Sequence, residues 1–107
     1  MTTKTKTALP RQIRVGKKLY TIDIIETMLR SGDMARVHYD KQKIEIGKRS
    51  SLTGKKFSSD EMHDSFWHEL VHAILFDMDE HTLNKNEEFV TAFANRLSDA
   101  ITSARFK

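Results

Sequence analysis

The sequence Phe66-Trp67-His68-Glu69-Leu70-Val71-His72-Ala73-Ile74-Leu75 places two imidazoles and one carboxylate inside an otherwise apolar run. On an α-helix, residues four positions apart lie about 40° apart around the axis and about 6 Å apart along it, so His68 and His72 can reach one ion. Glu69 follows His68 directly, and its carboxylate can approach a water molecule at that ion without being a ligand. One helical turn can therefore supply two metal ligands and a general base.

The apolar residues around this HExxH pattern predict a buried central helix. A buried imidazole or carboxylate needs a partner, and a zinc ion would satisfy all three polar side chains together. The pattern and its surroundings therefore indicate the zinc site of a metalloprotease. The alternative is a core helix in which protein groups hydrogen-bond to the two histidines.

Local signals mark the ends of this helix. Ser58, with Glu61 three residues later, forms a capping box, so the helix is expected to begin near Ser59 and to end near Asp77. His63, close to the helix start, is expected to face solvent.

A second helix is predicted after the first one. Apolar residues recur in steps of three and four from Val90 to Ile101. Asn84 or Asn86 can serve as its N-cap, because either side chain can accept a hydrogen bond from a backbone amide of the first turn.

The N-terminal half has the composition of strands. Residues 12–15 and 19–24 predict a β-hairpin, and residues 35–39 and 43–46 predict two further short strands around a tight polar connection. The segment 25–31 fits either a continued strand or a short helix. The predicted fold class is α+β: a small N-terminal antiparallel β-sheet followed by two helices, a minimal zincin-like domain with HExxH on the first long helix.

The composition indicates one small globular domain. The 107 residues are 38% hydrophobic and carry a formal net charge of +3, with charges of both signs interspersed. We expect a disordered basic tail over residues 1–10 and a single domain over residues 11–107. The absence of cysteine excludes disulfides and thiolate zinc sites. No apolar run approaches the roughly 20 residues of a membrane-spanning helix, so we expect a cytoplasmic protein without a membrane partner.

A catalytic zinc ion usually has three protein ligands and one position for water, so a third ligand is needed. Glu87 precedes Val90 by three residues and Ala94 by seven, and it therefore shares the inward stripe of the second helix. Glu88 is one position off that stripe, and His81 would need a loop that folds it back. An acidic residue in a first helical turn is also ordinary charge complementarity. We expect Glu87 as the third ligand, with Glu88 and His81 as alternatives.

Two segments resemble a known group of proteins. These segments are His68-Glu-Leu-Val-His-Ala-Ile74 and Asn86-Glu-Glu-Phe-Val-Thr-Ala-Phe-Ala-Asn-Arg-Leu97. They are similar to the small HExxH zinc metallopeptidase-like proteins of bacteriophages and prophages, broadly of the ImmA/IrrE metallo-endopeptidase type. The resemblance implies zinc, Glu87 as the third ligand, and limited proteolysis in the cytoplasm of a host cell. Val71 departs from the glycine that the larger relatives prefer, and we expect a single domain here without their extra domains.

The expected reaction is hydrolysis of a peptide bond in a protein or peptide substrate. His68, His72 and Glu87 hold the zinc ion, and Glu69 takes a proton from water and passes it to the leaving amine. The alternative is a protein-binding module without catalysis, in which a fourth protein ligand such as His81 closes a structural zinc site.

Other polar residues carry weaker signals. His38, Tyr20 or Tyr39 could stabilise an oxyanion if the fold places one of them beside the site. The basic residues near the N-terminus lack interleaved aromatic residues, so nucleic-acid binding is not favoured. The sequence does not indicate a particular oligomeric state.

Overall fold

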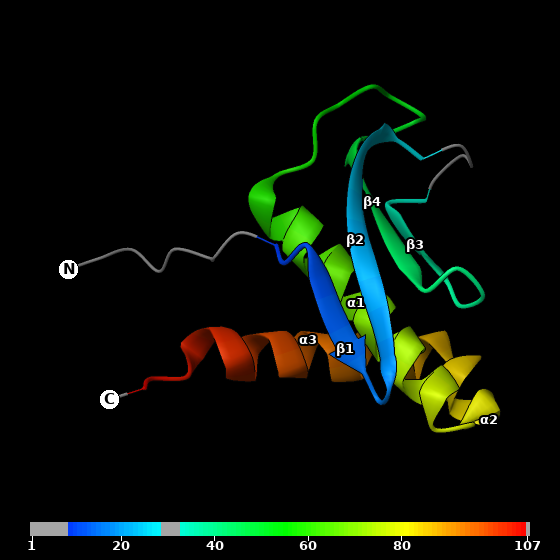
Figure 1. Cartoon of the computed structure of the whole chain (residues 1–107). Helices are drawn as coiled ribbons and strands as arrows, with labels where there is room; N and C mark the ends of the chain where they lie inside the picture. The colour runs from blue at the N-terminus through cyan, green and yellow to red at the C-terminus, as the bar shows by residue number, and fades with distance from the viewer. Residues whose placement is uncertain (1–8, 29–32, 107) are drawn as a thin grey trace.

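The computed structural model describes residues 9–28 and 33–106, and residues 1–8 of the predicted tail lie outside this range (Figure 1). Within it, the chain forms a sheet of four strands followed by three helices, which confirms the α+β class. The elements are β1 (Gln12–Val15), β2 (Lys18–Thr27), β3 (Ala35–His38), β4 (Lys43–Arg49), α1 (Ser59–Asp77), α2 (His81–Asn84) and α3 (Glu87–Ser103).

The strand order in the sheet is β1-β2-β4-β3. The pairs β1–β2 and β3–β4 are antiparallel, as the predicted hairpins require, but β2 and β4 pair in parallel. The prediction of an antiparallel sheet is therefore wrong, and the sheet is mixed. The reason is that β3 turns back after β2 and takes the sheet edge, so β4 enters between them in the direction of β2. The ambiguous segment continues β2 as far as Thr27, and residues 29–32 lie outside the described residues.

Alternate isoleucines build the face of the sheet that packs on α1. Ile44 and Ile46 of β4 are 0% exposed, and Ile22 of the neighbouring strand β2 is also buried. The alternation follows because successive side chains of a strand point to opposite faces. These residues form one core cluster with Phe66 and Leu70 of α1.

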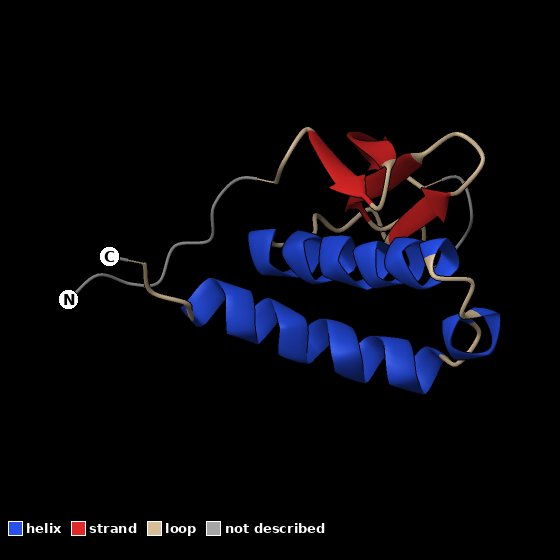
Figure 2. Cartoon of the chain, turned by 60° about the horizontal axis from the view of Figure 1, so that its bottom comes forward, coloured by secondary structure: helices blue, strands red, loops and turns tan. Residues whose placement is uncertain are grey.

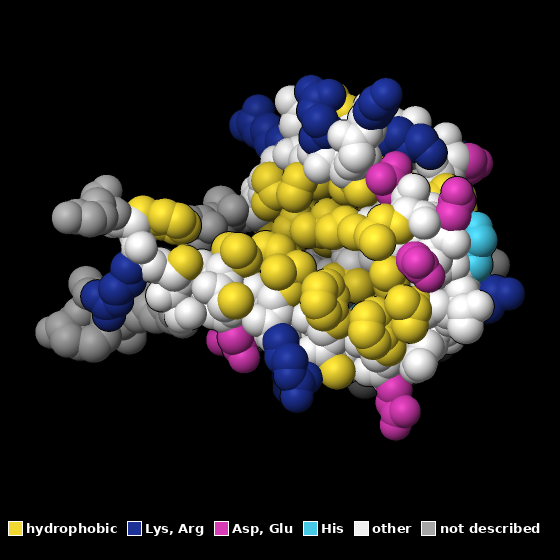
Figure 3. All heavy atoms as spheres, turned by 90° about the horizontal axis from the view of Figure 1, so that it is seen from below, with side chains coloured by type: hydrophobic (Ala, Val, Ile, Leu, Met, Phe, Trp, Pro, Cys, Tyr) yellow, Lys and Arg dark blue, Asp and Glu magenta, His cyan; other side chains and the backbone are white. Residues whose placement is uncertain are grey.

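Helix α1 lies between the sheet and α3, which gives the molecule three layers (Figure 2). On the side away from the sheet, Val71 and Leu75 pack against Val90 and Ala94 of α3. A helix that is covered on two sides must be apolar on two sides, which accounts for the nearly continuous hydrophobic run of α1. Helix α3 lies on the side of the molecule where hydrophobic side chains gather in Figure 3, and it carries the exposed Phe93.

The start of α1 is as predicted. Ser58 is the N-cap, and both hydrogen bonds of the capping box with Glu61 are present. At the start of α3, the side chain of Asn86 accepts a hydrogen bond from the Phe89 amide at 3.1 Å. Asn86 is therefore the N-cap, and Asn84 is free for another role.

A short helix, α2, lies between the two long ones, so the prediction of two helices is wrong. Helix α1 ends at Asp77, and Asp79 then adopts a left-handed φ of 59°. An aspartate tolerates this conformation, which commonly ends a helix and redirects the chain. The single turn of α2 that follows places Asn84 near the histidines of α1.

Candidate metal centre

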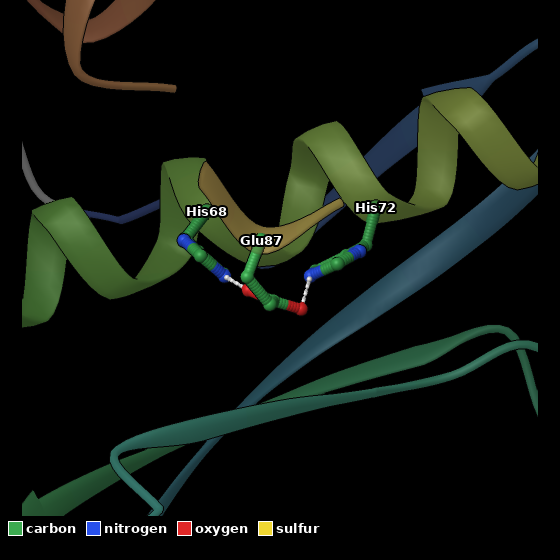
Figure 4. A group of neighbouring side chains, drawn as sticks. All are labelled: His68, His72 and Glu87. Atoms are coloured by element: carbon green, nitrogen blue, oxygen red, sulfur yellow. Dashed lines mark hydrogen bonds and ion pairs between the residues drawn. The ribbon is translucent and has the colours of Figure 1, made fainter. Parts of the chain in front are cut away.

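His68 and His72 project from the same side of α1, and Glu87 reaches both from the first turn of α3 (Figure 4). Glu87 Oε1 lies 3.1 Å from His68 Nε2, and Glu87 Oε2 lies 3.2 Å from His72 Nε2. One carboxylate thus spans both imidazoles. The tertiary structure brings together the three residues that we expected as ligands from the sequence.

The donor atoms of this group suit a metal ion. One ligand atom from each of the three side chains lies within 4.8 Å of the other two. Zinc–ligand bonds of about 2.0–2.1 Å in a tetrahedron separate neighbouring donor atoms by about 3.4 Å, close to the 3.1 and 3.2 Å between each imidazole nitrogen and its nearest Glu87 oxygen. Two imidazoles and one carboxylate are also a ligand set of catalytic zinc sites. The group could therefore bind a metal ion, and its three members in the described part of the chain leave a fourth coordination position.

The centre is buried on one side and open on the other. The side chain of His72 is 11% exposed, whereas the side chain of Glu87 is 67% exposed. Burial lowers the pKa of His68, the neighbouring His72 lowers it further, and Glu87 acts in the opposite direction. The lowered pKa favours the neutral imidazole, which is the form that binds a metal ion.

The side chain of Glu69 extends from α1 towards the edge strand β3. The backbone amide of Val37 donates a hydrogen bond to its carboxylate. Burial raises the pKa of the Glu69 carboxyl to about 7; Glu87 contributes to the rise, and His72 opposes it. A carboxyl group with a pKa near neutrality can both take up and return a proton, which suits a general base.

Two hollows meet at Glu69 and form a groove past the metal group. Glu69 and Ala35 line both hollows; His68 lines one of them, and His72 and Tyr39 line the other. The groove therefore lies between α1 and β3, and both histidines of the metal group line it.

The edge of β3 that no other strand of the described residues covers borders this groove. β3 is the last strand of the sheet (Figure 1). The Gly47 amide donates to the Met34 carbonyl at 2.9 Å, and in an antiparallel pair such bonds involve every second residue. The backbone groups of Ala35 and Val37 therefore point away from β4. The hydrogen bond from Val37 to Glu69 agrees with this direction.

Asn84 contacts both His72 and Tyr39, and no pattern in the sequence predicted these contacts. Its Oδ1 lies 2.6 Å from His72 Nδ1, and its Nδ2 donates to the Tyr39 hydroxyl at 3.1 Å. The Tyr39 ring stacks on Phe76, with centroids 4.0 Å apart and planes at 9°. Burial raises the pKa of Tyr39, against the effect of the Asn84 hydrogen bond. A metal-binding histidine needs a partner for its second nitrogen, but no sequence pattern indicates which residue supplies it.

The alternative ligands lie apart from the metal group. His81 Nε2 is 3.6 Å from Asp79 Oδ1, and the His81 side chain is 58% exposed on α2. Glu88 is exposed in the first turn of α3 and does not belong to the group. The expectation that His63 faces solvent is wrong, because α1 is covered on two sides and His63 is buried.

Tyr39 is the one oxyanion candidate from the sequence that lines the groove. Tyr20 is buried in the core between the sheet and α1. His38 Nε2 lies 2.9 Å from Glu45 Oε1, on the neighbouring strand β4. Tyr39, by contrast, shares a hollow with Glu69 and His72.

Comparisons with protein families, with curated proteins and with solved structures find no match. Within the described residues, no helix has the length and apolar character needed to cross a membrane.

Proposed function

We propose that this chain is a zinc-dependent metallopeptidase that hydrolyses peptide bonds with Glu69 as the general base. The observation that carries the proposal is the convergence of His68, His72 and Glu87, from two helices, beside the half-buried carboxyl of Glu69 in a groove. The resemblance to phage and prophage metallopeptidase-like proteins supports the same activity, with limited proteolysis inside a cell as its setting.

The residues divide the chemistry between them. A zinc ion held by His68, His72 and Glu87 would polarise the scissile carbonyl and lower the pKa of a water molecule to about 7. Glu69 accepts a proton from the attacking water while the water oxygen bonds to the carbonyl carbon. It then gives this proton to the leaving nitrogen as the C–N bond breaks. The Val37 amide holds the carboxylate at the groove.

The edge of β3 is the proposed binding surface for the substrate. An extended peptide in the groove can hydrogen-bond with the outward backbone groups of Ala35 and can thereby add a strand to the sheet. Backbone pairing of this kind positions the scissile bond without selecting a particular side chain. A protein segment that is locally unfolded is the class of substrate that fits.

The test compares zinc content and cleavage in two variants. Glu69→Gln should retain zinc, measured by atomic absorption after dialysis, and should lower cleavage of an unfolded reporter protein by about 100-fold or more. His72→Ala should lose both zinc and cleavage, because it removes a ligand. Glu88→Gln is the matched control, since it neutralises the adjacent carboxylate of α3 that lies outside the group.

Each outcome bears on a different part of the proposal. Cleavage that survives Glu69→Gln would overturn the assigned general base. A protein that binds zinc but cleaves no unfolded substrate would support the alternative of a zinc-stabilised binding module. That alternative requires a fourth protein ligand, and the exposed position of His81 on α2 favours the peptidase over it.

A further inference from the structure

The contacts of Asn84 link His72 to Tyr39 through a single amide group. We propose that Asn84 is a positioning residue that sets the proton on both partners. Its oxygen holds His72 in the Nδ1–H form, which leaves Nε2 for a metal ion. Its nitrogen donates to the Tyr39 oxygen, so the Tyr39 proton is donated into the groove. The Tyr39 half of the proposal rests on the proposed peptidase function, whereas the His72 half requires only metal binding.

The proton on His72 follows from its two contacts. A neutral imidazole carries one N–H, and an amide oxygen can only accept a hydrogen bond. With Asn84 Oδ1 at 2.6 Å, the proton must therefore lie on Nδ1. In the neutral ring, the lone pair of Nε2 then lies 3.2 Å from Glu87 Oε2, so one metal ion can bind to both atoms.

The opposite orientation of the amide would be incompatible with a metal site. If the Asn84 nitrogen faced His72, Nδ1 would have to accept, and the single proton would lie on Nε2. In the structure the amide oxygen faces His72, and Asn84 Nδ2 donates to the Tyr39 hydroxyl at 3.1 Å. Tyr39 is itself held by its stacking on Phe76. The orientation of one amide is thereby coupled to the availability of a metal ligand.

The hydroxyl hydrogen of Tyr39 remains available for a hydrogen bond. Its oxygen accepts from Asn84, so its own hydrogen is directed to another acceptor. Tyr39 lines the hollow that also contains Glu69 and His72. A hydrogen-bond donor in this hollow could reach a carbonyl oxygen that gains negative charge during hydrolysis, and such a donor stabilises the transition state.

The first arm of the test measures zinc affinity by competition with a chromophoric chelator. Asn84→Leu removes the acceptor and should weaken zinc binding by about 10–100-fold. Asn84→Asp retains an oxygen for His72 and should restore the affinity to within a few fold of the wild type. Thr82→Leu, at an exposed position of the same helix, controls for a leucine on α2. Circular dichroism verifies that each variant is folded.

Cobalt gives a second readout of the same arm. The visible spectrum of the cobalt-loaded protein reports ligand geometry, and Asn84→Leu should alter it, whereas Thr82→Leu should not. Wild-type zinc affinity and an unchanged cobalt spectrum in Asn84→Leu would overturn the assignment of Asn84. Failure of Asn84→Asp to rescue the affinity would overturn the role of the amide oxygen.

The second arm uses Tyr39→Phe, which keeps the ring and its stacking but removes the hydroxyl. Zinc affinity should stay close to that of the wild type. Acetohydroxamic acid, added to the zinc-loaded protein in a calorimeter, should bind about 10–100-fold more weakly, because it loses one hydrogen bond to a charged group. With a cleaved peptide, kcat should fall while KM changes little.

The outcomes separate this inference from the proposed function. Equal binding of acetohydroxamic acid by the wild type and by Tyr39→Phe would show that the hydroxyl does not donate into the groove. If the wild type cleaves no peptide, the proposed function fails, but the zinc and acetohydroxamic acid measurements still decide the roles of Asn84 and Tyr39. Active wild-type enzyme with unaffected Asn84 and Tyr39 variants would overturn this inference alone.

Discussion

Helix α1 has two interfaces, and they are built differently. Towards the sheet it is closed by apolar packing, with Ile44, Ile46 and Phe66 at 3% exposure or less. Towards α3 the apolar cluster is smaller, and the interface includes the polar contacts of His68 and His72 with Glu87. The first interface needs nothing beyond the chain, whereas the second contains a group that a metal ion would complete.

This difference assigns separate tasks to the two halves of the fold. The sheet and α1 pack through an apolar core, and α1 presents the two histidines. Helix α3 supplies the third donor, so a metal ion would join α3 to α1. A metal ion that binds the folded state alone adds its binding free energy to stability. We therefore expect the α1–α3 half to respond to zinc and the sheet half to be indifferent to it.

The largest expected effect tests the apolar half. Ile46→Ala removes a fully buried side chain and should lower the free energy of unfolding by about 2–5 kcal/mol, measured by urea titration. The loss should be the same with and without zinc. Ile24→Ala is the matched control, because Ile24 pairs with Ile46 in the neighbouring strand but is 45% exposed. A loss that zinc restores would erase the distinction between the two interfaces.

The next effect tests the polar half. At a zinc concentration about 100 times the dissociation constant, the wild type should gain about 2.7 kcal/mol of stability. Glu87→Ala should lose most of this gain and should change the metal-free protein little, because the Glu87 side chain is 67% exposed. Glu88→Ala should behave like the wild type. Paired urea titrations, in zinc and in chelator, measure the stability of each variant with and without the metal. If zinc stabilised Glu87→Ala as much as Glu88→Ala, Glu87 would not be a ligand.

The N-caps of α1 and α3 allow a further test of the two interfaces, with a smaller expected effect on stability. Ser58→Ala and Asn86→Ala each remove a side chain that caps a helix, and each should cost about 1 kcal/mol in thermal or urea unfolding. Only Asn86→Ala should also weaken zinc binding, because Asn86 fixes the turn that carries Glu87. An equal effect of both variants on zinc affinity would show that general stability, rather than local position, governs the site.

The smallest expected effect concerns pH and the sheet. A hydrogen bond from His38 lowers the pKa of the Glu45 carboxyl below its usual 4.5, although burial opposes the shift. A lowered folded-state pKa contributes stability above the unfolded-state pKa, and this is lost as the pH falls through the folded-state pKa. The free energy of unfolding of the metal-free protein, measured by urea titration at several pH values, should therefore fall below about pH 4.5. In Glu45→Gln this fall should be less steep. An unchanged slope in Glu45→Gln would assign the acid sensitivity to other groups.

Features that depend on neighbours in the sequence were predicted well. The capping box of Ser58 and Glu61 predicted the start of α1, and the helix spans Ser59–Asp77 as expected. The hairpin of β1 and β2 was also predicted correctly. Two histidines four residues apart must share a helix face, so their juxtaposition needed no tertiary information. The choice of Glu87 over Glu88 rested on helical periodicity together with the resemblance to HExxH metallopeptidase-like proteins, and the structure places Glu87 against both rings.

Other features depend on contacts between distant residues, and local patterns carry no information about them. The parallel pairing of β2 with β4 depends on how β3 returns to the sheet, and the burial of His63 depends on what covers α1. Asn84 contacts His72 across 12 residues and Tyr39 across 45. The HExxH turn and its helix were thus local properties of the chain, whereas the groove and the partners of its histidines arose only when the sheet, α1, α2 and α3 packed together.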